Sequence, residues 1–306
     1  MKKILVTGAA GLFGINFCLN SCRDHAVVGI TRRYIKGLPF EIDQADLLEK
    51  GAVTKLIEKH KPDIILHAAA NANLDDCERN PRATRQLNTE LPGRIAEITA
   101  QRGIQFLHIS TDAVFHDAGE RVFTETDSPN PVNTYGQTKL EGENLVLQAD
   151  PYAIVARVNF FGWSIEGKKS LAEFFFNNLF AKTKCFGFTD VFFCPMHIED
   201  LTETFHKMLN KQLNGLYHVV GSETLSKYEF GQQLGRIFGL DINLISPQKV
   251  DLSTLSTPRS HNLRLNIHKL STALGQEIPG YQQGLERLYS QYNQGYPQLL
   301  RSYQHN

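Results

Sequence analysis

The stretch "KILVTGAAGLFG", residues 3–14, joins a short apolar run to three glycines spaced three apart. The apolar run predicts a buried β-strand, and the glycines stand where a helix is expected to begin. Glycines at such a turn permit a tight bend, let the backbone approach a pyrophosphate and allow a helix to pack closely on a strand. The helix N-terminus then faces the anion. The pattern predicts a dinucleotide site that includes Gly8, Gly11, Leu12, Phe13 and Gly14.

The first residues also carry two lysines before the apolar run, which resembles the start of a signal peptide. The run breaks at Gly8 and turns polar by Asn16 and Asn20, and the sequence holds no stretch of 18 apolar residues that would span a bilayer. We therefore interpret residues 3–7 as a buried first strand.

Composition narrows the class of partner. The 306 residues include 32 basic and 32 acidic side chains, and the sequence pI is about 7.2. A nucleic-acid or anionic-membrane partner would require a clustered basic field, so we expect neither. The five cysteines are scattered, and Cys18 and Cys22 have no second Cys or His pair to complete a zinc site. We expect no metal site, and reduced thiols in a cytoplasmic protein.

Apolar runs and helical patterns alternate through the first 160 residues. The expected strands are continuous and rich in β-branched residues, as in sheets covered on both faces: 3–7, 26–31, 63–69, 105–110, 152–158 and, later, 215–221. The expected helices include 49–60, 82–102 and 171–180, and Ser226 with Glu229 predicts a capping box for another. This order predicts an α/β Rossmann-type, doubly wound parallel sheet with a smaller C-terminal substrate-binding lobe. We assign the NADP-binding Rossmann domain to 1–160 with further core elements from 190–222, and the smaller lobe to 161–189 and 223–306.

The end of the second expected strand bears on the cofactor. NAD-binding proteins of this type carry a carboxylate there for the ribose hydroxyls, but this chain reads "GITRRY", residues 29–34. Arginine binds phosphate well, so Arg32 and Arg33 favour NADP(H) over NAD(H), although both can also be solvated loop charges. Asp46 and Leu47 precede the expected helix 49–60 and could flank the adenine, or Asp46 could cap a helix.

Residues 134–139, "TYGQTK", place a tyrosine and a lysine four apart on one face of an expected helix. Tyr135 could deliver a proton, and a nearby lysine would favour a lower tyrosine pKa. The alternative is an ordinary surface pair that contributes about 0.3 kcal/mol to the helix.

With the glycine spacing, "YGQTK" resembles the extended short-chain dehydrogenase/reductase superfamily. Within it, residues 108–143, "HISTDAVFHDAGERVFTETDSPNPVNTYGQTKLEGE", closely resemble the dTDP-4-dehydrorhamnose reductase family. That family typically reads Ser-Thr-Asp-Tyr-Val-Phe-Asp-Gly, then Glu-x-Asp, a proline pair and Tyr-Gly-x-x-Lys followed by Gly-Glu. Further similarities include "PDIILHAAANANLDDCERNP", "LNTELPGRIAE", "FFCPMHIEDL" and "TPRSHNLRLNIHKL", so the resemblance spans most of the chain.

The resemblance implies site residues. Tyr135 would protonate a carbonyl whose carbon receives hydride from NADPH, Lys139 would hold the nicotinamide ribose, and Thr111 or Ser110 would bond the carbonyl oxygen. Further cofactor-binding residues would be Ala68, Ala69, Ala70, Asn88 and Ser110, and Tyr135 would also contact the cofactor. The substrate-binding residues would be Thr111, Asp112, Ala113, Phe115, Asn159, Phe160 and Arg259.

Two departures from the family pattern affect the substrate pocket. Ala113 stands where the family has tyrosine, with His116-Asp117 for Asp-Gly, and Asn159-Phe160-Phe161 replaces a Ser-Trp pattern. His116 and His197 could be acid/base groups or, as is commoner for single histidines, structural ones.

These features predict an NADPH-dependent reductase of a nucleotide-linked 4-keto-6-deoxysugar. Members of the family that it resembles are often dimers, so the resemblance also implies a homodimer. The alternatives are a nucleotide-sugar epimerase or dehydratase of the same superfamily, and a non-catalytic regulatory subunit resembling the methionine adenosyltransferase β subunit.

Overall fold

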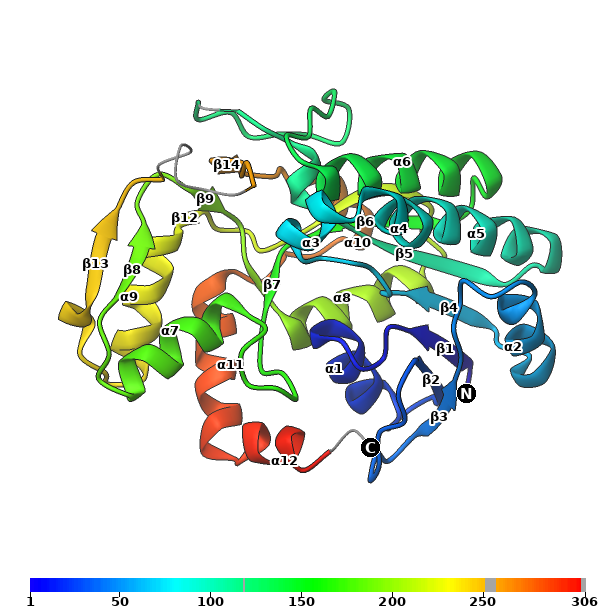
Figure 1. Cartoon of the computed structure of the whole chain (residues 1–306), viewed down its shortest axis with the longest axis horizontal. Coiled ribbons are helices and arrows are strands. Elements are labelled where there is room, and N and C mark those ends of the chain that lie inside the picture. The colour runs from blue at the N-terminus through cyan, green and yellow to red at the C-terminus, as the bar shows by residue number, and fades with distance from the viewer. Residues whose placement is uncertain (118, 251–256, 304–306) are drawn as a thin grey trace.

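The computed structural model describes residues 1–117, 119–250 and 257–303. Within them, seven parallel strands form one sheet in the order β11-β6-β5-β4-β1-β2-β3 (Figure 1). The strands are β1 Lys3–Thr7, β2 Ala26–Thr31, β3 Glu41–Gln44, β4 Ile64–His67, β5 Gln105–Thr111, β6 Ile154–Val158 and β11 Gly215–Val219. The chain builds outward from β1 in both directions, so the switch point lies between β1 and β4. The predicted doubly wound sheet is confirmed.

Helices cover both faces of this sheet. One face is covered by α2 Ala52–His60, α5 Leu91–Arg102 and α6 Thr134–Ala149, and the other by α1 Leu12–Ser21, α8 Ile198–Asn210 and α10 His268–Leu274 (Figure 1). Alternation along β1 shows the division: Leu5 packs with α2 and α5, whereas Ile4 and Val6 pack with α1 and α8. A strand buried on both faces therefore reads as a continuous apolar run.

The region expected to be one helix over 82–102 is divided. It forms α4 Pro81–Arg85, a π-helical turn Gln86–Glu90 and α5, and α3 Leu74–Arg79 precedes them. The apolar spacing of Leu87, Ile95 and Ile98 does not reveal the break. Such turns are rare and occur frequently at functional sites. Here the turn carries Asn88, one of the expected cofactor residues.

The smaller lobe packs around Trp163 and the phenylalanines of α7. Its helices are α7 Leu171–Phe180, α9 Lys227–Ile237, α11 Tyr281–Asn293 and α12 Tyr296–Ser302, with a short 3₁₀ turn at Ile242–Leu244. Its strands are β8 Cys185–Phe188 with β13 Ile245–Gln248, and a small sheet of β12 Leu225–Ser226, β9 Phe192–Phe193 and β14 Asn262–Leu263. The helix predicted at 171–180 and the Ser226–Glu229 capping box are confirmed.

Two connections tie the lobe to the sheet. β7 Phe160–Phe161 leaves the end of β6 and pairs with β10 Met196–His197, which leads into α8. Leu270 and Leu274 of α10 pack in the same core cluster as α8 and β11. The C-terminal part of the chain therefore supplies one helix to the sheet layers as well as most of the smaller lobe.

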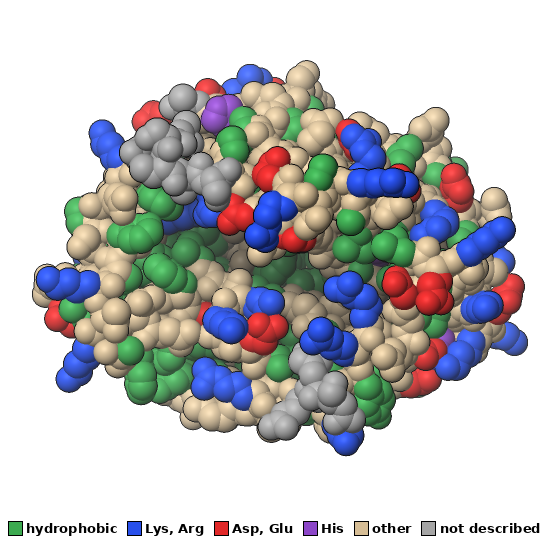
Figure 2. All heavy atoms as spheres, in the orientation of Figure 1, with side chains coloured by type: hydrophobic (Ala, Val, Ile, Leu, Met, Phe, Trp, Pro, Cys, Tyr) green, Lys and Arg blue, Asp and Glu red, His purple; other side chains and the backbone are tan. Residues whose placement is uncertain are grey.

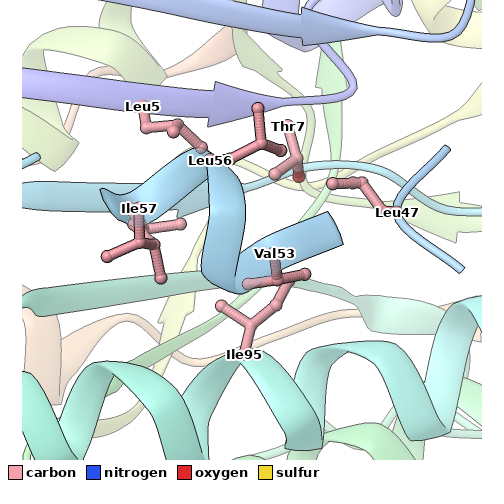
Figure 3. A pocket seen from close by; sticks show the side chains of 8 residues that line it. Leu5, Thr7, Leu47, Val53, Leu56, Ile57 and Ile95 are labelled. Atoms are coloured by element: carbon pink, nitrogen blue, oxygen red, sulfur yellow. The ribbon is translucent and has the colours of Figure 1, made fainter. Parts of the chain in front are cut away.

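A small gap remains between α2, α5 and the sheet (Figure 3). Its volume is about 10 Å³, and its lining is apolar apart from Thr7. A water molecule needs at least this much room and two or more polar partners, so we regard the gap as a dry packing defect. Leu47 lines it, which places that side chain in the core.

The described ranges contain neither a membrane-spanning helix nor a cluster of metal ligands. No helix there is long and apolar enough to cross a membrane. Nor do three or more His, Cys, Asp or Glu side chains of those residues gather as a metal ion would need. All five cysteines lie in the described part of the chain and carry free thiols.

Candidate active site

The glycine loop lies between β1 and α1. Gly8 has a φ of +70°, and a Cβ there would come within 2.7 Å of the Ala69 nitrogen, so only glycine fits between the ends of β1 and β4. Gly11 is exposed and stands at the N-cap of α1, and among the described residues no side chain caps that helix. The free backbone N–H groups of its first turn suit a phosphate.

Ala68, Ala69 and Ala70 continue the chain from β4 beside this loop. The Ala68 and Ala69 nitrogens donate to the carbonyl and the hydroxyl of Thr7, at 3.2 and 3.3 Å. Both residues are partly exposed, and Ala70 is exposed. The predicted strand end at 69 is therefore loop, and it lies beside the glycine loop.

Arg32 and Arg33 follow β2 with exposed side chains, and neither forms an ion pair within the described residues. Their carbonyl oxygens accept from Gln44 Nε2 at 2.8 Å and Thr31 Oγ1 at 2.7 Å, which fixes the backbone and leaves the guanidinium groups available. Asp46 accepts from the Leu48 nitrogen at 2.9 Å and so closes a local turn.

The side chains of two more expected cofactor residues are engaged by other residues of the chain. Phe13 is 4% exposed and its ring packs 5.6 Å from Phe160, so only its backbone can meet a ligand. Asn88 holds the loop after β4: its Oδ1 accepts from the Asn71 nitrogen and its Nδ2 donates to the Asn71 oxygen, both at 2.9 Å. Asn88 thus joins that loop to the π-helical turn.

Tyr135 stands in the first turn of α6, whose N-cap Asn133 accepts from the Gly136 nitrogen at 2.8 Å. A Cβ on Gly136 would lie 2.4 Å from the Ala113 oxygen. The glycine therefore lets the start of α6 touch the 3₁₀ turn Asp112–Val114, which follows β5 directly. This close approach places Tyr135 beside Thr111.

Burial raises the pKa of the half-buried Tyr135 hydroxyl to about 12, and the Thr111 hydroxyl beside it opposes part of the rise. The sequence led us to expect that Lys139 lowers this pKa, but Lys139 is directed elsewhere. The phenol consequently keeps its proton at neutral pH, as a proton donor requires.

Lys139 is 2% exposed, and its ammonium group is held against β5. It donates to the Ile109 oxygen at 2.6 Å and lies 3.2 Å from His108 Nε2. Burial lowers the pKa of Lys139 to about 8, while Glu143 one turn along the helix opposes the change.

Two buried histidines connect Lys139 to the neighbouring strands of the sheet. His108 stacks on His67, with ring centroids 5.4 Å apart, and His67 Nδ1 lies 2.6 Å from the Thr7 hydroxyl. Burial and the charge of Lys139 lower the pKa of His67 to about 3 and that of His108 well below its usual value, so both stay neutral and can accept a hydrogen bond. The sequence analysis missed them, although each stands near the end of an expected strand and they pair in register.

A buried ion pair lies behind Lys139. Arg157 of β6 donates to Glu143 through Nε at 3.0 Å and through Nη2 at 2.7 Å, and the Ser110 hydroxyl also donates to Glu143, at 2.5 Å. Ser110 is thus occupied beneath the site. Of the two hydroxyls that the sequence left open, Thr111 is the one beside Tyr135.

The substrate side begins at Asp112, which is 4% exposed. Asn159 Nδ2 donates to one of its oxygens at 2.5 Å and the Thr111 hydroxyl to the other at 3.2 Å. Burial raises the pKa of Asp112 to about 6. Ala113 and Phe160 are partly exposed nearby in the chain, so Thr111, Asp112, Ala113, Asn159 and Phe160 belong to one region.

Phe115 is misplaced in the predicted substrate set. It is fully buried, and its ring stacks on Phe123 with centroids 4.3 Å apart. The Arg157 guanidinium also lies over the Phe115 ring, 4.8 Å from its centroid. The chain turns at Asp112–Val114, which directs the next aromatic residue into the core.

The two candidate histidines have partners of their own within the chain. His197 is fully buried and caps α8 by accepting from the Glu199 nitrogen at 3.3 Å, and burial lowers its pKa to about 3. The backbone of His116 exchanges two hydrogen bonds with Asn130. His197 is therefore structural.

Arg259 lies between Pro258 and Ser260, which are tied to α6 and to the loop after β5. Lys227, which the sequence analysis missed, interacts electrostatically with both Arg259 and Asp112. Figure 2 shows a depression near the middle of the face that it draws, with hydrophobic side chains on its floor and both basic and acidic ones at its rim.

Comparison with known families places the whole arrangement in context. Residues 1–294 match the family described as the RmlD substrate binding domain. The chain is 28% identical to "Probable low-salt glycan biosynthesis reductase Agl14" of Haloferax volcanii over 94% of this chain and 98% of that protein. It is 31% identical to methionine adenosyltransferase 2 subunit beta of Bos taurus over 91% of this chain and 84% of that protein. It is 30% identical to dTDP-4-dehydrorhamnose reductase of Escherichia coli (strain K12) over 80% of this chain and 85% of that protein.

Solved structures share the fold. A dTDP-4-dehydrorhamnose reductase from Bacillus anthracis in complex with NADP superposes with a TM-score of 0.81 at 21% identity, over 95% of this chain and 99% of that one. A dTDP-glucose 4,6-dehydratase from the same organism in complex with NAD gives 0.80 at 18% identity, over 98% of this chain and 100% of that one. Neighbours of this fold hold a nicotinamide dinucleotide.

Proposed function

The chain belongs to the dTDP-4-dehydrorhamnose reductase-like family of extended short-chain dehydrogenase/reductases, which are NAD(P)-dependent oxidoreductases, and on that premise we propose that it reduces the keto group of a nucleotide-linked 4-keto-6-deoxysugar with NADPH. The observation that carries the proposal is the placement of a protonated Tyr135 beside Thr111, one helical turn from Lys139.

Each residue has a defined role in the proposal. Tyr135 donates its proton to the carbonyl oxygen of the substrate, and the Thr111 hydroxyl bonds the same oxygen and orients it. Bound NADPH would supply the hydride. With the cofactor bound, Lys139 would exchange its contacts on β5 for the nicotinamide ribose, and its charge would then stabilise the tyrosinate that remains after proton transfer.

The cofactor would extend along the edge where β1, β2 and β4 end. Its pyrophosphate would meet the uncapped first turn of α1 at Gly11, and Arg32 and Arg33 would bind a 2′-phosphate. Both guanidinium groups are exposed and unpaired within the described ranges, which supports NADP(H) rather than NAD(H). The same feature weakens the epimerase or dehydratase alternative, whose members usually carry an acidic residue here.

The sugar would lie against Asp112, Ala113, Asn159 and Phe160. Ala113 leaves room where the family has a tyrosine side chain. The Asn159–Asp112 contact replaces the Ser-Trp pattern with a polar pair. We propose that these substitutions change which sugar is accepted while the proton-transfer residues stay as they are.

The test mixes the purified chain with NADPH and a panel of nucleotide-linked 4-ketosugars, and follows nicotinamide absorbance. We expect at least one to be reduced, and Tyr135→Phe to lose that activity by about 100-fold or more, because general-acid catalysis contributes about that much. NADPH affinity should be unchanged in the variant, since the phenyl ring remains.

A second candidate function follows from the similarity to the methionine adenosyltransferase subunit. A regulatory subunit would bind NADP(H) without turning over a sugar. Tight NADPH binding with no reduction of any ketosugar in the panel would support it and would overturn the reductase proposal.

A further inference from the structure

The small sheet of the C-terminal lobe brings two distant basic residues together. Ser226 of β12 and Asn262 of β14 both pair with Phe192 of β9. β12 runs antiparallel to β9 and β14 runs parallel to it, so the chain that leaves β12 and the chain that enters β14 lie at the same end of the sheet. Lys227 leaves β12 there, and the segment with Arg259 arrives there.

The segment around Arg259 is fastened to the Rossmann side of the site. The Pro258 oxygen accepts from Asn133 Nδ2 at 2.9 Å, and the Ser260 hydroxyl donates to the Phe115 oxygen at 2.8 Å. Asn133 caps the helix of Tyr135, and Phe115 follows the turn that begins at Asp112. Arg259 is thereby held between the start of α6 and the loop after β5.

Among the described residues, the two cations at this place lack ion-pair partners. Neither Lys227 nor Arg259 forms an ion pair with a described residue, and Arg259 Nε is buried without a hydrogen-bond partner there. Burial and the charge of Arg259 lower the pKa of Lys227, and Asp112 opposes this. Asp112 is already bonded to Asn159 and Thr111. Two cations that repel each other beside one occupied carboxylate favour the arrival of an anion.

We propose that Lys227 and Arg259 together bind an oxyanion of the substrate, either its diphosphate or a carboxylate on its sugar. The inference rests on the proposed function for the statement that the ligand is a nucleotide-linked sugar. The guanidinium fork can bond two oxygens of such a group, and the ammonium adds a point charge. Lys227 is then a specificity residue that neither the glycine loop nor the Tyr-Lys pair indicates.

The experiment measures binding calorimetrically with the full chain, without turnover. The probes are dTDP, dTDP-glucose, UDP-glucose and UDP-glucuronate, and the variants are Lys227→Met, which keeps the length of the side chain, and Lys227→Arg, which keeps its charge. Lys184→Met removes an exposed lysine of the same lobe as a matched control. NADPH affinity is also measured in each variant, and a value equal to that of wild type shows that the Rossmann side is intact.

If the pair binds the diphosphate, Lys227→Met weakens all four probes by about tenfold, the size expected for one charge-assisted hydrogen bond. If it binds a sugar carboxylate, only UDP-glucuronate loses affinity relative to UDP-glucose. In both cases Lys227→Arg restores most of the binding, and Lys184→Met changes nothing.

Equal affinities in wild type and Lys227→Met, or no binding of any probe by the wild type, would overturn the inference. These outcomes are separate from failure of the proposed function. Binding of dTDP that depends on Lys227 in a chain that reduces no ketosugar keeps the subsite and removes the reductase. Reduction of a ketosugar with the same KM in Lys227→Met as in wild type would keep the reductase function and remove the subsite.

Discussion

Lys139 and Lys227 stand on opposite sides of the site, and the chain treats their charges differently. The ammonium of Lys139 is met by the Ile109 carbonyl and by a neutral His108, and behind it Glu143 is fully engaged with Arg157 and Ser110. Lys227 has Arg259 as a neighbour and a carboxylate that is already bonded elsewhere.

This difference in partners distinguishes buried polar groups that stabilise the fold from groups that remain available to a ligand. A buried group whose partners come from the chain helps to define the position of α6 on the sheet. A cation with no partner in the described residues contributes little to folding and is available to an anion. Substitutions on the two sides should therefore affect different measurements.

The largest effect is expected at Glu143. Glu143→Gln leaves Arg157 without its counter-charge in a place where both side chains are at most 3% exposed. We expect the free energy of unfolding to fall by about 3 kcal/mol, measured by urea denaturation. Glu141→Gln on the same helix removes the charge that pairs with Arg85 at the surface, while an amide oxygen remains for Gln137, and should lose less than about 1 kcal/mol. Equal losses in the two variants would remove the distinction.

The pH dependence of turnover tests Lys139 directly. Its pKa is lowered to about 8, so the ammonium is lost as the pH rises above that value, whereas Tyr135 with a pKa of about 12 keeps its proton. We expect kcat/KM to fall about tenfold per pH unit above about pH 8, because this ratio reports groups of the free enzyme. Lys139→Arg should shift the fall to higher pH, since the guanidinium stays charged. A profile that is the same in both proteins would assign the ionisation to another group.

The arginines after β2 extend the comparison to the cofactor. Arg32→Ala combined with Arg33→Ala should weaken NADPH by about tenfold or more and leave NADH nearly unchanged, because only NADPH carries the 2′-phosphate. Fluorescence titration of both cofactors measures this. The melting temperature should not change. Equal weakening of NADPH and NADH would refute the phosphate assignment.

The smallest effect is expected for the stability of Lys227→Met. Removal of a cation that faces Arg259 should leave the free energy of unfolding within about 0.5 kcal/mol of wild type. The same urea denaturation that is used for Glu143→Gln measures it. A loss of about 2 kcal/mol would mean that the fold itself uses this charge.

The cofactor half of the site could be predicted from the sequence because its determinants are local. Gly8, Gly11 and Gly14 follow a strand and open a helix, and Tyr135 and Lys139 lie on one helical face. Each pattern fits within a dozen residues, and the parallel sheet then brings the strand ends together. Thr111 was foreseen as a strand end for the same reason.

The substrate half depends on contacts that no short pattern records. Lys227 and Arg259 meet through strands of two residues each, which carry no periodicity. Phe115 was assigned to the pocket by resemblance. The turn at Asp112–Val114, which Gly136 approaches at Ala113, instead directs its ring into the core. The stack of His67 and His108 was not predicted, because a single histidine in a strand is usually structural.

The small sheet of β12, β9 and β14 has a consequence for divergence among relatives. Strands of two residues offer few ladder hydrogen bonds, so a single replacement or insertion can reposition the segments that leave them without disturbing the seven-stranded sheet. The residues presented at positions such as 227 and 259 can therefore change while the seven-stranded sheet keeps its structure. This division is compatible with the range of proteins to which the chain is similar, which includes a glycan biosynthesis reductase and a methionine adenosyltransferase subunit.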